Sequence, residues 1–495
     1  MSLNLLGASS RNQSAVLVVS IGVFVGALDQ TVVVTALPDM ITDLGVPITR
    51  LDDAAWIVDG YLLGYAASLP LIGRLGDVRG RRLALFVCFA LFLLGSVAVA
   101  LAPDLWSLVA ARMVQAVGGG GLLPVALSLA VEDSDGRGWI VLLGIVGAVA
   151  EAGAVLGPLY GGIITKWLGW RWIFWIHIPL VAVLGLATWF ALRSYRGSET
   201  RERVDWLGAV WIGLGLGALI VGLSQIASRH PTVPVPPVWF VAAGLTLLAA
   251  YAVVAYRWSS PVVNVRLFGR AGFAAACLVS VLIGVAFIVV MVDVPLLANA
   301  VFNKTPLEGG LMLMRFSVFL PIGGVLGGIA ARRFGNRITG AVGLVLIAFG
   351  LFSVSMWPAD VDDFRIGRDL ASAGFGFGLL LAPVVASAVA AVGEKYAGTA
   401  TALTHVSRVI GMMMGLSVLT SWGLARFQAA MAEVPLPLPR LDEAAEVYQE
   451  RLAEYQTIFE DAIWGIYRDT FFAAAIVTLV ALVPLLAMRV KTHIE

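Results

Sequence analysis

Charged residues are scarce in this chain. Only 13% of its 495 residues are Asp, Glu, Lys or Arg, whereas 59% are hydrophobic, and the mean hydropathy is +0.91. Soluble domains carry about 25% charged residues, and a soluble protein this apolar would lack the polar surface that water requires. The scarcity of charge therefore excludes a soluble fold and predicts an integral membrane protein.

Cysteine and ligand-binding motifs are scarce as well. The two cysteines, Cys88 and Cys277, lie in apolar runs and cannot form a disulfide framework. The chain has no GxxxxGK[ST] phosphate loop, no His/Cys/Glu cluster with metal spacing and no long basic run. We therefore expect no enzyme activity, no ATP-driven pump, no metal or other cofactor, and no nucleic-acid partner. The apolar run from Ala15 is long enough to be a first span, so we expect the N-terminus to be kept.

Long apolar runs fill most of the sequence. A transmembrane helix needs roughly 20 apolar residues, and unbroken runs favour helices over the alternating strands of a barrel. Fourteen such runs centre near residues 26, 64, 93, 118, 150, 183, 216, 247, 286, 320, 347, 381, 411 and 478. The expected fold is all-α, with 14 transmembrane helices.

The loops that follow every second span are rich in arginine. An even number of spans places both chain ends on one side, and arginine favours the cytoplasmic side. The arginines on the side shared with the ends are Arg74, Arg79, Arg81, Arg82, Arg193, Arg196, Arg201, Arg203, Arg257, Arg266, Arg270, Arg332, Arg333 and Arg337. Both termini are therefore expected in the cytoplasm.

A charged, glycine-rich loop joins the second and third expected spans. Residues 73–85 read GRLGDVRGRRLAL, and residues 328–337 repeat the pattern as GIAARRFGNR, with Arg332 in place of the acid. The first loop resembles the signature loop of the major facilitator superfamily, on the residues Gly73, Asp77, Gly80, Arg81 and Arg82. The repeat fits a transporter of two six-helix bundles with the substrate path between them. The loop is expected to be a conformational lock.

Two spans are in excess of the twelve that two such bundles contain. They lie at about 206–227 and 237–257, and we expect them as an insertion. The N-terminal bundle would then cover residues 1–200, the inserted spans 201–262, and the C-terminal bundle 263–495. This layout resembles the 14-span drug:proton antiporter branch of the superfamily.

The fifth span contains a glycine motif. Gly153, Gly157 and Gly161 recur every four residues, so one helix face has no side chains and another helix can approach closely. Pro158 is expected to kink the span. With Gly162, this stretch resembles the antiporter signature of the superfamily, which implies export. Tight packing alone would also explain the glycines, and both readings can hold together.

Ionisable residues within the spans are rare. A charge in the middle of the bilayer costs at least about 2.5 kcal/mol and is a functional candidate by default. Asp29, Glu151 and Arg408 lie deepest, and we expect them to be buried together as a proton-coupling cluster. Arg112 and Gln115 resemble the superfamily's motif in the fourth span. Secondary candidates are Asp59, Asp293 and Arg315, which could instead be solvated at the interface, and His405, which could be a packed residue.

The longest extramembrane segment, 427–466, precedes the last span. It begins with the proline-rich stretch VPLPLP at 434–439, after which apolar residues recur at alternating steps of four and three. That period predicts an amphipathic helix whose apolar stripe includes Leu452, Tyr455 and Phe459. The helix could lie on the protein as a solvated cap, extend an exit path for lipid, or dock a partner.

Several stretches resemble one subgroup of the branch. GALDQTVVVT at 26–35, WIVDGYLLGY at 56–65, RWIFWIHIPL at 171–180 and LPIGGVLGG at 320–328 are similar to the mycobacterial lipid exporters. The resemblance implies a proton-coupled exporter of lipophilic substrates such as triacylglycerides, in a bacterial inner membrane. It also implies an extracytoplasmic lipid-binding lipoprotein as a partner.

The resemblance also extends to single residues. Asp29, Glu151 and Arg408 fall where the subgroup carries its intramembrane acids and arginine, whereas His177 stands where this branch usually has Asn. Two other functions stay open. A multidrug:proton antiporter would require an unpaired acid in its cavity, for which Asp29 could serve, and a non-transporting membrane scaffold would need no buried ion pair.

Overall fold

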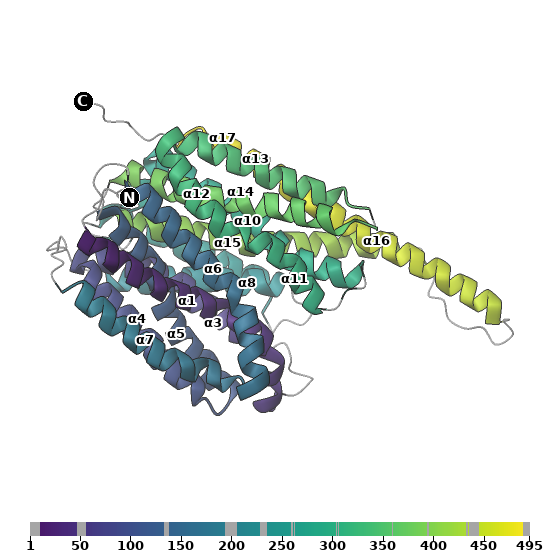
Figure 1. Ribbon diagram of the computed structural model, residues 1–495, viewed down its shortest axis with the longest axis horizontal. Coiled ribbons are helices and arrows are strands. Elements are labelled where there is room, and N and C mark those ends of the chain that lie inside the picture. The colour runs from purple at the N-terminus through teal and green to yellow at the C-terminus, as the bar shows by residue number, and fades with distance from the viewer. Residues whose placement is uncertain are drawn as a thin grey trace.

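Helices make up nearly all of the described chain (Figure 1). The computed structural model describes residues 10–46, 56–132, 138–193, 205–227, 235–258, 263–302, 306–358, 360–393, 396–431 and 445–488, together with 261, 304 and 434. The helices are α1 (Ser10–Asp43), α3 (Trp56–Arg79), α4 (Arg81–Ala100), α5 (Leu105–Glu132), α6 (Gly138–Leu168), α7 (Arg171–Ala191), α8 (Trp206–Ala227), α9 (Pro237–Arg257), η2 (Val265–Gly269), α10 (Ala271–Ala300), α11 (Pro306–Ser317), α12 (Phe319–Phe334), α13 (Asn336–Ser355), α14 (Asp363–Val392), α15 (Ala397–Met431), α16 (Ala445–Val480) and α17 (Leu482–Leu485).

Eleven helices of the described residues are long and apolar enough to cross a membrane. They account for eleven of the expected spans, and α3, α8 and α15 lie at the other three positions. The prediction of an all-α membrane protein is confirmed, while the count of fourteen spans stays a prediction. The expected span near residue 320 consists of two helices, α11 and α12, which meet at Val318.

The helices pack as two groups (Figure 1). Helices α1 and α3–α7 form the N-terminal bundle, and α10–α17 form the C-terminal bundle. Helix α8 packs on α9 and also against α3 and α15, so it contacts both bundles. The domain boundaries expected from the sequence are compatible with these contacts and remain a prediction.

Two contacts define the faces of the molecule. Arg337 at the start of α13 donates to the carbonyls of Leu486 and Met488 after α17, at the face where α1 begins. We call this the terminal face. Arg171 at the start of α7 pairs with Asp43 at the end of α1, on the opposite or distal face.

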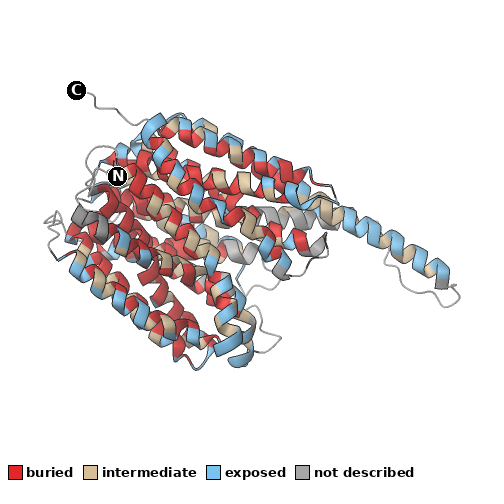
Figure 2. Ribbon diagram, in the orientation of Figure 1, coloured by how far each residue is buried: buried red, intermediate tan, exposed pale blue. Residues whose placement is uncertain are grey.

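Exposed residues lie on the outer sides of the helices (Figure 2), and many of them are apolar. On α13, exposed apolar side chains recur at steps of four, three, four and three, which is a single helix face. They are Ile338, Val342, Val345, Phe349 and Phe352. Such a stripe suits hydrocarbon and would be a liability in water. The buried side chains lie inside the bundles and between them.

The repeated loop found in the sequence is also a structural repeat. Gly80, between α3 and α4, has φ +89°, and Gly335, between α12 and α13, has φ +88°. Residues with a side chain rarely adopt this conformation. The same turn therefore connects corresponding helices of the two bundles.

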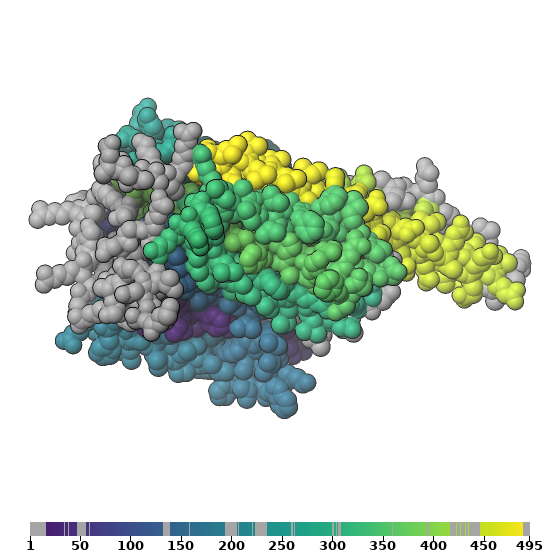
Figure 3. All heavy atoms as spheres, turned by 45° about the horizontal axis from the view of Figure 1, so that its top comes forward, coloured from purple at the N-terminus to yellow at the C-terminus, as the bar shows by residue number. Residues whose placement is uncertain are grey.

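Helix α16 differs from the expected amphipathic segment. It runs unbroken from Ala445 to Val480, so the amphipathic part and the last span are one helix. Its first half projects past the rest of the molecule on the distal face (Figures 1 and 3). A cap lying on the protein is therefore wrong for this half. Residues 435–444, which include most of the proline-rich stretch, lie outside the described residues.

Helices α1 and α6 touch at backbone distance along the glycine motif. A methyl group on Gly153 would lie 2.3 Å from the carbonyl oxygen of Phe24, and one on Gly161 would lie 2.4 Å from that of Val32. Gly162 points away from this contact. The side chain of Pro158 lies outside the described residues.

We predict that Gly153→Ala destabilises the protein, because overpacking of a tight contact costs about 1–3 kcal/mol. Gly162→Ala is the control, since no described atom lies within 4 Å of its added methyl. Thermal unfolding of the purified variants in detergent measures both, and Gly153→Ala should unfold several degrees lower. Equal unfolding temperatures would contradict the backbone contact between α1 and α6.

Candidate functional site

A second face of α6 packs on the C-terminal bundle. A methyl on Gly144 would lie 2.4 Å from the carbonyl oxygen of Gly324 on α12, and one on Gly147 would lie 3.5 Å from Leu381 on α14. Glu151 follows Gly147 after one helical turn and so points in the same direction. Small residues on α6 therefore bring the two bundles together within two helical turns before Glu151.

Glu151 pairs with Arg408 across the two bundles. Nη1 of Arg408 on α15 donates to Oε1 of Glu151 at 2.8 Å, and their side chains are only 17% and 8% exposed. The guanidinium carbon lies 5.7 Å from the ring centre of Phe287 on α10. Removing one partner of a buried pair costs about 3–5 kcal/mol, because the other charge stays unpaired. The pair therefore favours the arrangement in which the bundles touch.

His405 connects Arg408 to a third helix. Its Nε2 lies 3.0 Å from the hydroxyl of Tyr65 on α3, and its Nδ1 lies 3.5 Å from Nη2 of Arg408. One turn of α15 thus contacts both α3 and α6 of the N-terminal bundle.

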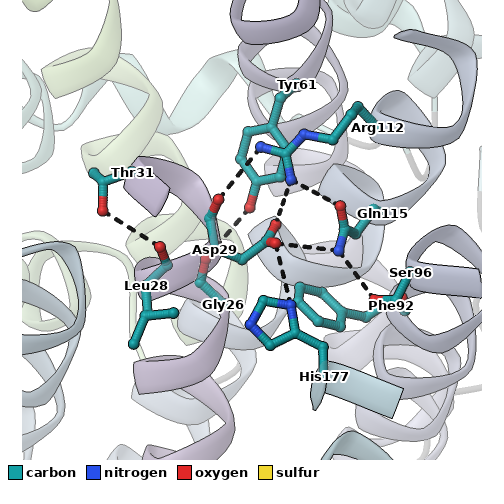
Figure 4. A network of polar contacts seen from close by, with 10 residues as sticks. All are labelled: Gly26, Leu28, Asp29, Thr31, Tyr61, Phe92, Ser96, Arg112, Gln115 and His177. Carbon is teal, nitrogen blue, oxygen red and sulfur yellow. Dashed lines mark hydrogen bonds and ion pairs between the residues drawn. The ribbon is translucent and has the colours of Figure 1, made fainter. Parts of the chain in front are cut away.

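Asp29 lies in a separate network inside the N-terminal bundle (Figure 4). Its carboxylate, which is fully buried, accepts from Nη1 of Arg112 at 2.8 Å and from Nε2 of Gln115 at 3.1 Å. Gln115 also donates to Ser96 on α4. The guanidinium carbon of Arg112 lies 4.1 Å from the ring centre of Tyr61 on α3.

His177 completes this network from α7. Its Nδ1 lies 3.4 Å from Oδ1 of Asp29, while three aromatic rings surround the imidazole, those of Phe92, Tyr160 and Phe174. No hydrogen bond from a described residue reaches either ring nitrogen. The histidine is therefore held mainly by its aromatic contacts and by the nearby carboxylate.

The expected cluster of Asp29, Glu151 and Arg408 thus divides into two sites. The reason is the rotation of α1, which packs on α5 where Gly26 meets Gly119. Asp29 lies one turn after Gly26, so it faces α5 and pairs with its arginine instead of reaching α15. The structure brings Glu151 and Arg408 together and places Asp29 elsewhere.

Asp77 bridges the bundles at the terminal face. Its carboxylate accepts from the backbone N–H of Gly398 at 3.1 Å, and from the N–H and hydroxyl of Thr399 at 3.0 and 2.9 Å. These donors form the first turn of α15, where the helix dipole favours a negative charge. Arg81, the first residue of α4, lies 3.3 Å from the carboxylate. We call Asp77, Gly398 and Thr399 the terminal gate.

The described cross-bundle polar contacts lie between the terminal face and the middle of the helices. Besides the gate, the Glu151–Arg408 pair and the contact of Tyr65 with His405, Thr401 donates to the carbonyl of Pro124. Gly73 also meets Gly398 closely, since a methyl on Gly73 would lie 2.7 Å from its carbonyl oxygen. The bundles are therefore closed toward the terminal face.

The secondary candidates have different surroundings. Arg315 pairs with Asp363 at 2.7 Å in an exposed position near the distal face, which favours an interfacial role. Asp293 is half-buried on α10, and no described cation pairs with it. Asp59 lies on α3, but its side chain is outside the described residues.

Several residues that contact the candidate residues were not predicted from the sequence. Tyr65, Gly398 and Thr399 are residue types common in membrane helices, so only their neighbours in space single them out. The sequence analysis also missed Asp369 on α14, which is fully buried and accepts from Trp357 at 2.9 Å and from Arg368 at 2.8 Å. The sequence could have indicated Asp369, because it is an acidic residue in a helix that is otherwise largely apolar.

The chain belongs to the Major Facilitator Superfamily, whose model matches residues 19–416. The described residues of the fold agree with solved members. The human organic anion transporter MFSD10 has a TM-score of 0.62 at 15% identity, covering 96% of this chain and 99% of its own. The proton:xylose symporter XylE has a TM-score of 0.60 at 15% identity, with 95% of both chains covered. At this identity the likeness supports the fold alone.

Curated relatives are closer in sequence. The triacylglyceride transporter of Mycolicibacterium smegmatis is 35% identical over 497 residues, covering 96% of this chain and 87% of the relative. That of Mycobacterium tuberculosis is 36% identical over 500 residues, covering 96% and 94%. The resemblance to mycobacterial lipid exporters is confirmed. Family and relatives together indicate a membrane transporter rather than an enzyme.

We predict that Asp77→Asn opens the terminal gate, because the amide nitrogen cannot accept and would face either the N–H of Gly398 or the N–H and hydroxyl of Thr399. Hydrogen bonds to a charged group are worth about 1.5–3 kcal/mol, so the balance of states should shift by about ten- to a hundredfold. A single cysteine at Thr401, with Cys88 and Cys277 replaced by Ala, should then react faster with a thiol reagent, and transport should fall.

The control for this variant is Asp104→Asn, which makes the same chemical change at the start of α5. Asp104 accepts from the N–H groups of Trp106 and Ser107 in an exposed position, away from the other bundle. Its variant should leave the reactivity of the cysteine unchanged. Equal reactivity in the wild type and in Asp77→Asn would argue against the gate.

Proposed function

We propose that this protein exports lipophilic substrates, lipids such as triacylglycerides, in exchange for protons by alternating access. The observation that carries the proposal is the ion pair of Glu151 and Arg408, which joins the bundles at the middle of the helices. The names of the relatives support the substrate class. The arginine-rich loops support a cytoplasmic terminal face, in a bacterial plasma membrane.

A proton and an ion pair compete at Glu151. Arginine stays charged in proteins, so the acid is the group that gains or loses a proton. A protonated Glu151 no longer attracts Arg408 strongly, and the contact between the bundles weakens. A proton that arrives from the distal side would thus favour opening of the terminal face, where a lipid could enter. Loss of the proton to the cytoplasm would restore the pair and return the closed arrangement.

Asp29 has another role in this scheme. Its contacts come from helices of its own bundle, so they need not break when the bundles separate. We infer that the Asp29 network keeps the N-terminal bundle rigid while it moves. This weakens the multidrug alternative, since that reading needs an unpaired cavity acid and Asp29 is paired and buried.

The projecting half of α16 is the proposed exit segment. Leu452 and Tyr455 are half-buried, and the ring of Tyr455 stacks on Phe459 at 6.2 Å between centres. The stripe continues the last span beyond the bundles. It suits a lipid leaving the distal side, or an extracytoplasmic lipid-binding lipoprotein that receives it.

We predict that Glu151→Gln abolishes transport driven by a pH gradient. The loss of the acid removes the proton site and leaves Arg408 without its counter-ion, at a cost of about 3–5 kcal/mol. The assay is transfer of labelled triacylglyceride from proteoliposomes, with proton movement followed by an internal pH dye. Arg408→Ala should be equally inactive.

Asp363→Asn is the matched control, because it breaks an exposed pair with Arg315 near the distal face. It should transport at close to the wild-type rate. Normal transport by Glu151→Gln, with protons still moving, would show that the coupling site lies elsewhere. Absence of substrate-dependent proton movement in the wild type would reject proton coupling itself.

We predict that replacing Leu452, Tyr455 and Phe459 with Ser lowers export several-fold while the protein stays in the membrane. The change removes the apolar stripe from a helix half that contacts little else. The control replaces Glu450, Glu454 and Gln456, exposed residues of the same helix half, with Ser. Export at the wild-type level, or failure of the triple variant to accumulate, would count against the exit segment.

A further inference from the structure

His405 contacts the Glu151–Arg408 site, and the proposed function gives it no role. It is the link between Arg408 and Tyr65, with 3.5 Å between Nδ1 and Nη2 and 3.0 Å between Nε2 and the tyrosine hydroxyl. The tyrosine ring is also tilted against the imidazole, with 5.7 Å between the ring centres. Packing alone would not require both ring nitrogens to face polar groups.

The partners of His405 determine where its proton lies. A guanidinium has only N–H donors, so Nδ1 must accept from Arg408 and carries no hydrogen in this arrangement. The ring hydrogen is then on Nε2, which donates to the hydroxyl oxygen of Tyr65. This assignment follows from the contacts on both sides of the ring. His405 is neutral as long as Arg408 faces it.

Few charges surround the ring. Arg408 lies on the same helix, Tyr65 comes from α3, and Glu151 of α6 acts from the far side of Arg408. Among the described residues, α5, α8, α10, α14 and α16 place no charged side chain against the imidazole. The state of His405 is therefore governed by the position of Arg408.

We propose that His405 is a second proton-binding residue of the Glu151–Arg408 site, neutral while the bundles touch and protonated when they separate. The inference rests on the proposed function and deepens it. A hydrogen on Nδ1 would point at the guanidinium, so protonation of the ring and its contact with Arg408 exclude each other.

Protonation of Glu151 and protonation of His405 both favour separation of the bundles. A proton on Glu151 releases Arg408 from the carboxylate, and the arginine can then move away from the imidazole. Nδ1 becomes free to take one further proton from water, and the resulting positive ring repels Arg408. Because Nε2 keeps its hydrogen, the contact with Tyr65 on α3 can persist, while the repulsion keeps Arg408 from its contacts with the imidazole and with Glu151 on α6. Loss of both protons would restore the two contacts together.

Nitrogen-15 spectroscopy of the histidine rings tests the state directly. The chain has four histidines, and His405→Asn identifies the signal of His405 in nanodiscs. At about pH 8 we expect the neutral form with hydrogen on Nε2. On acidification the ring should become doubly protonated, and in Asp77→Asn it should do so at higher pH, because that variant favours separated bundles. Hydrogen on Nδ1 at high pH, or a ring that stays neutral in both proteins, would overturn the inference.

Transport by His405→Asn provides the second test. The Asn side chain keeps an acceptor near the position of Nδ1 but cannot take a proton. We expect transport to continue with fewer protons moved per substrate and a shallower dependence on pH. An unchanged proton-to-substrate ratio overturns the inference while leaving the proposed function intact. Absence of proton movement in the wild type rejects the proposed function, and the spectroscopic result still decides the state of His405.

Discussion

A charge pair between two apolar bundles is the constraint on which the rest of the structure depends. Glu151 and Arg408 are largely shielded from water, and either charge alone would be costly there. The two bundles that carry them approach at backbone distance between α6 and α12, which Gly144 and Gly324 permit. The glycine contact and the ion pair thus both require the bundles to touch. In the proposed function, a change in the charge of one side chain shifts the equilibrium between touching and separated bundles.

The two ionic networks differ in what happens to them when the bundles move. The contacts of Asp29 on α1 come from α5 and α7, and α4 joins the network through Gln115, all within one bundle, so a rigid-body motion leaves them intact. In the proposed cycle, the pair of Glu151 and Arg408 and the terminal gate at Asp77 would have to break, because each joins the two bundles. Rigid bundles that rotate around a central site are how transporters with internal repeats change access. A stable inner network is what lets the breakable contacts act together.

Sequence reasoning succeeded where the signal is local. Apolar runs located the helices, and the spacing of Gly153, Gly157 and Gly161 indicated a close helix contact, which α1 provides. It failed where the answer depends on how a helix is rotated against its neighbour. Asp29 lies at the expected depth, yet the contact of α1 with α5 turns it toward Arg112. Nothing in the sequence fixes that rotation, and a single Tyr or Thr gives no sign that it will meet His405 or Asp77.

The long helix α16 also differs from the expectation, and its length determines where its apolar stripe lies. The sequence predicts an amphipathic helix followed by a span, and no proline separates them, so the two continue as one rod. Acids at 450, 454, 460 and 461 are exposed on the projecting half, and they oppose its insertion into the bilayer. An apolar stripe is thereby held outside the membrane in line with a membrane-spanning helix. Because the hydrophobic effect is non-directional, such a stripe can bind any apolar molecule that reaches it, which is the property that the proposed exit segment requires.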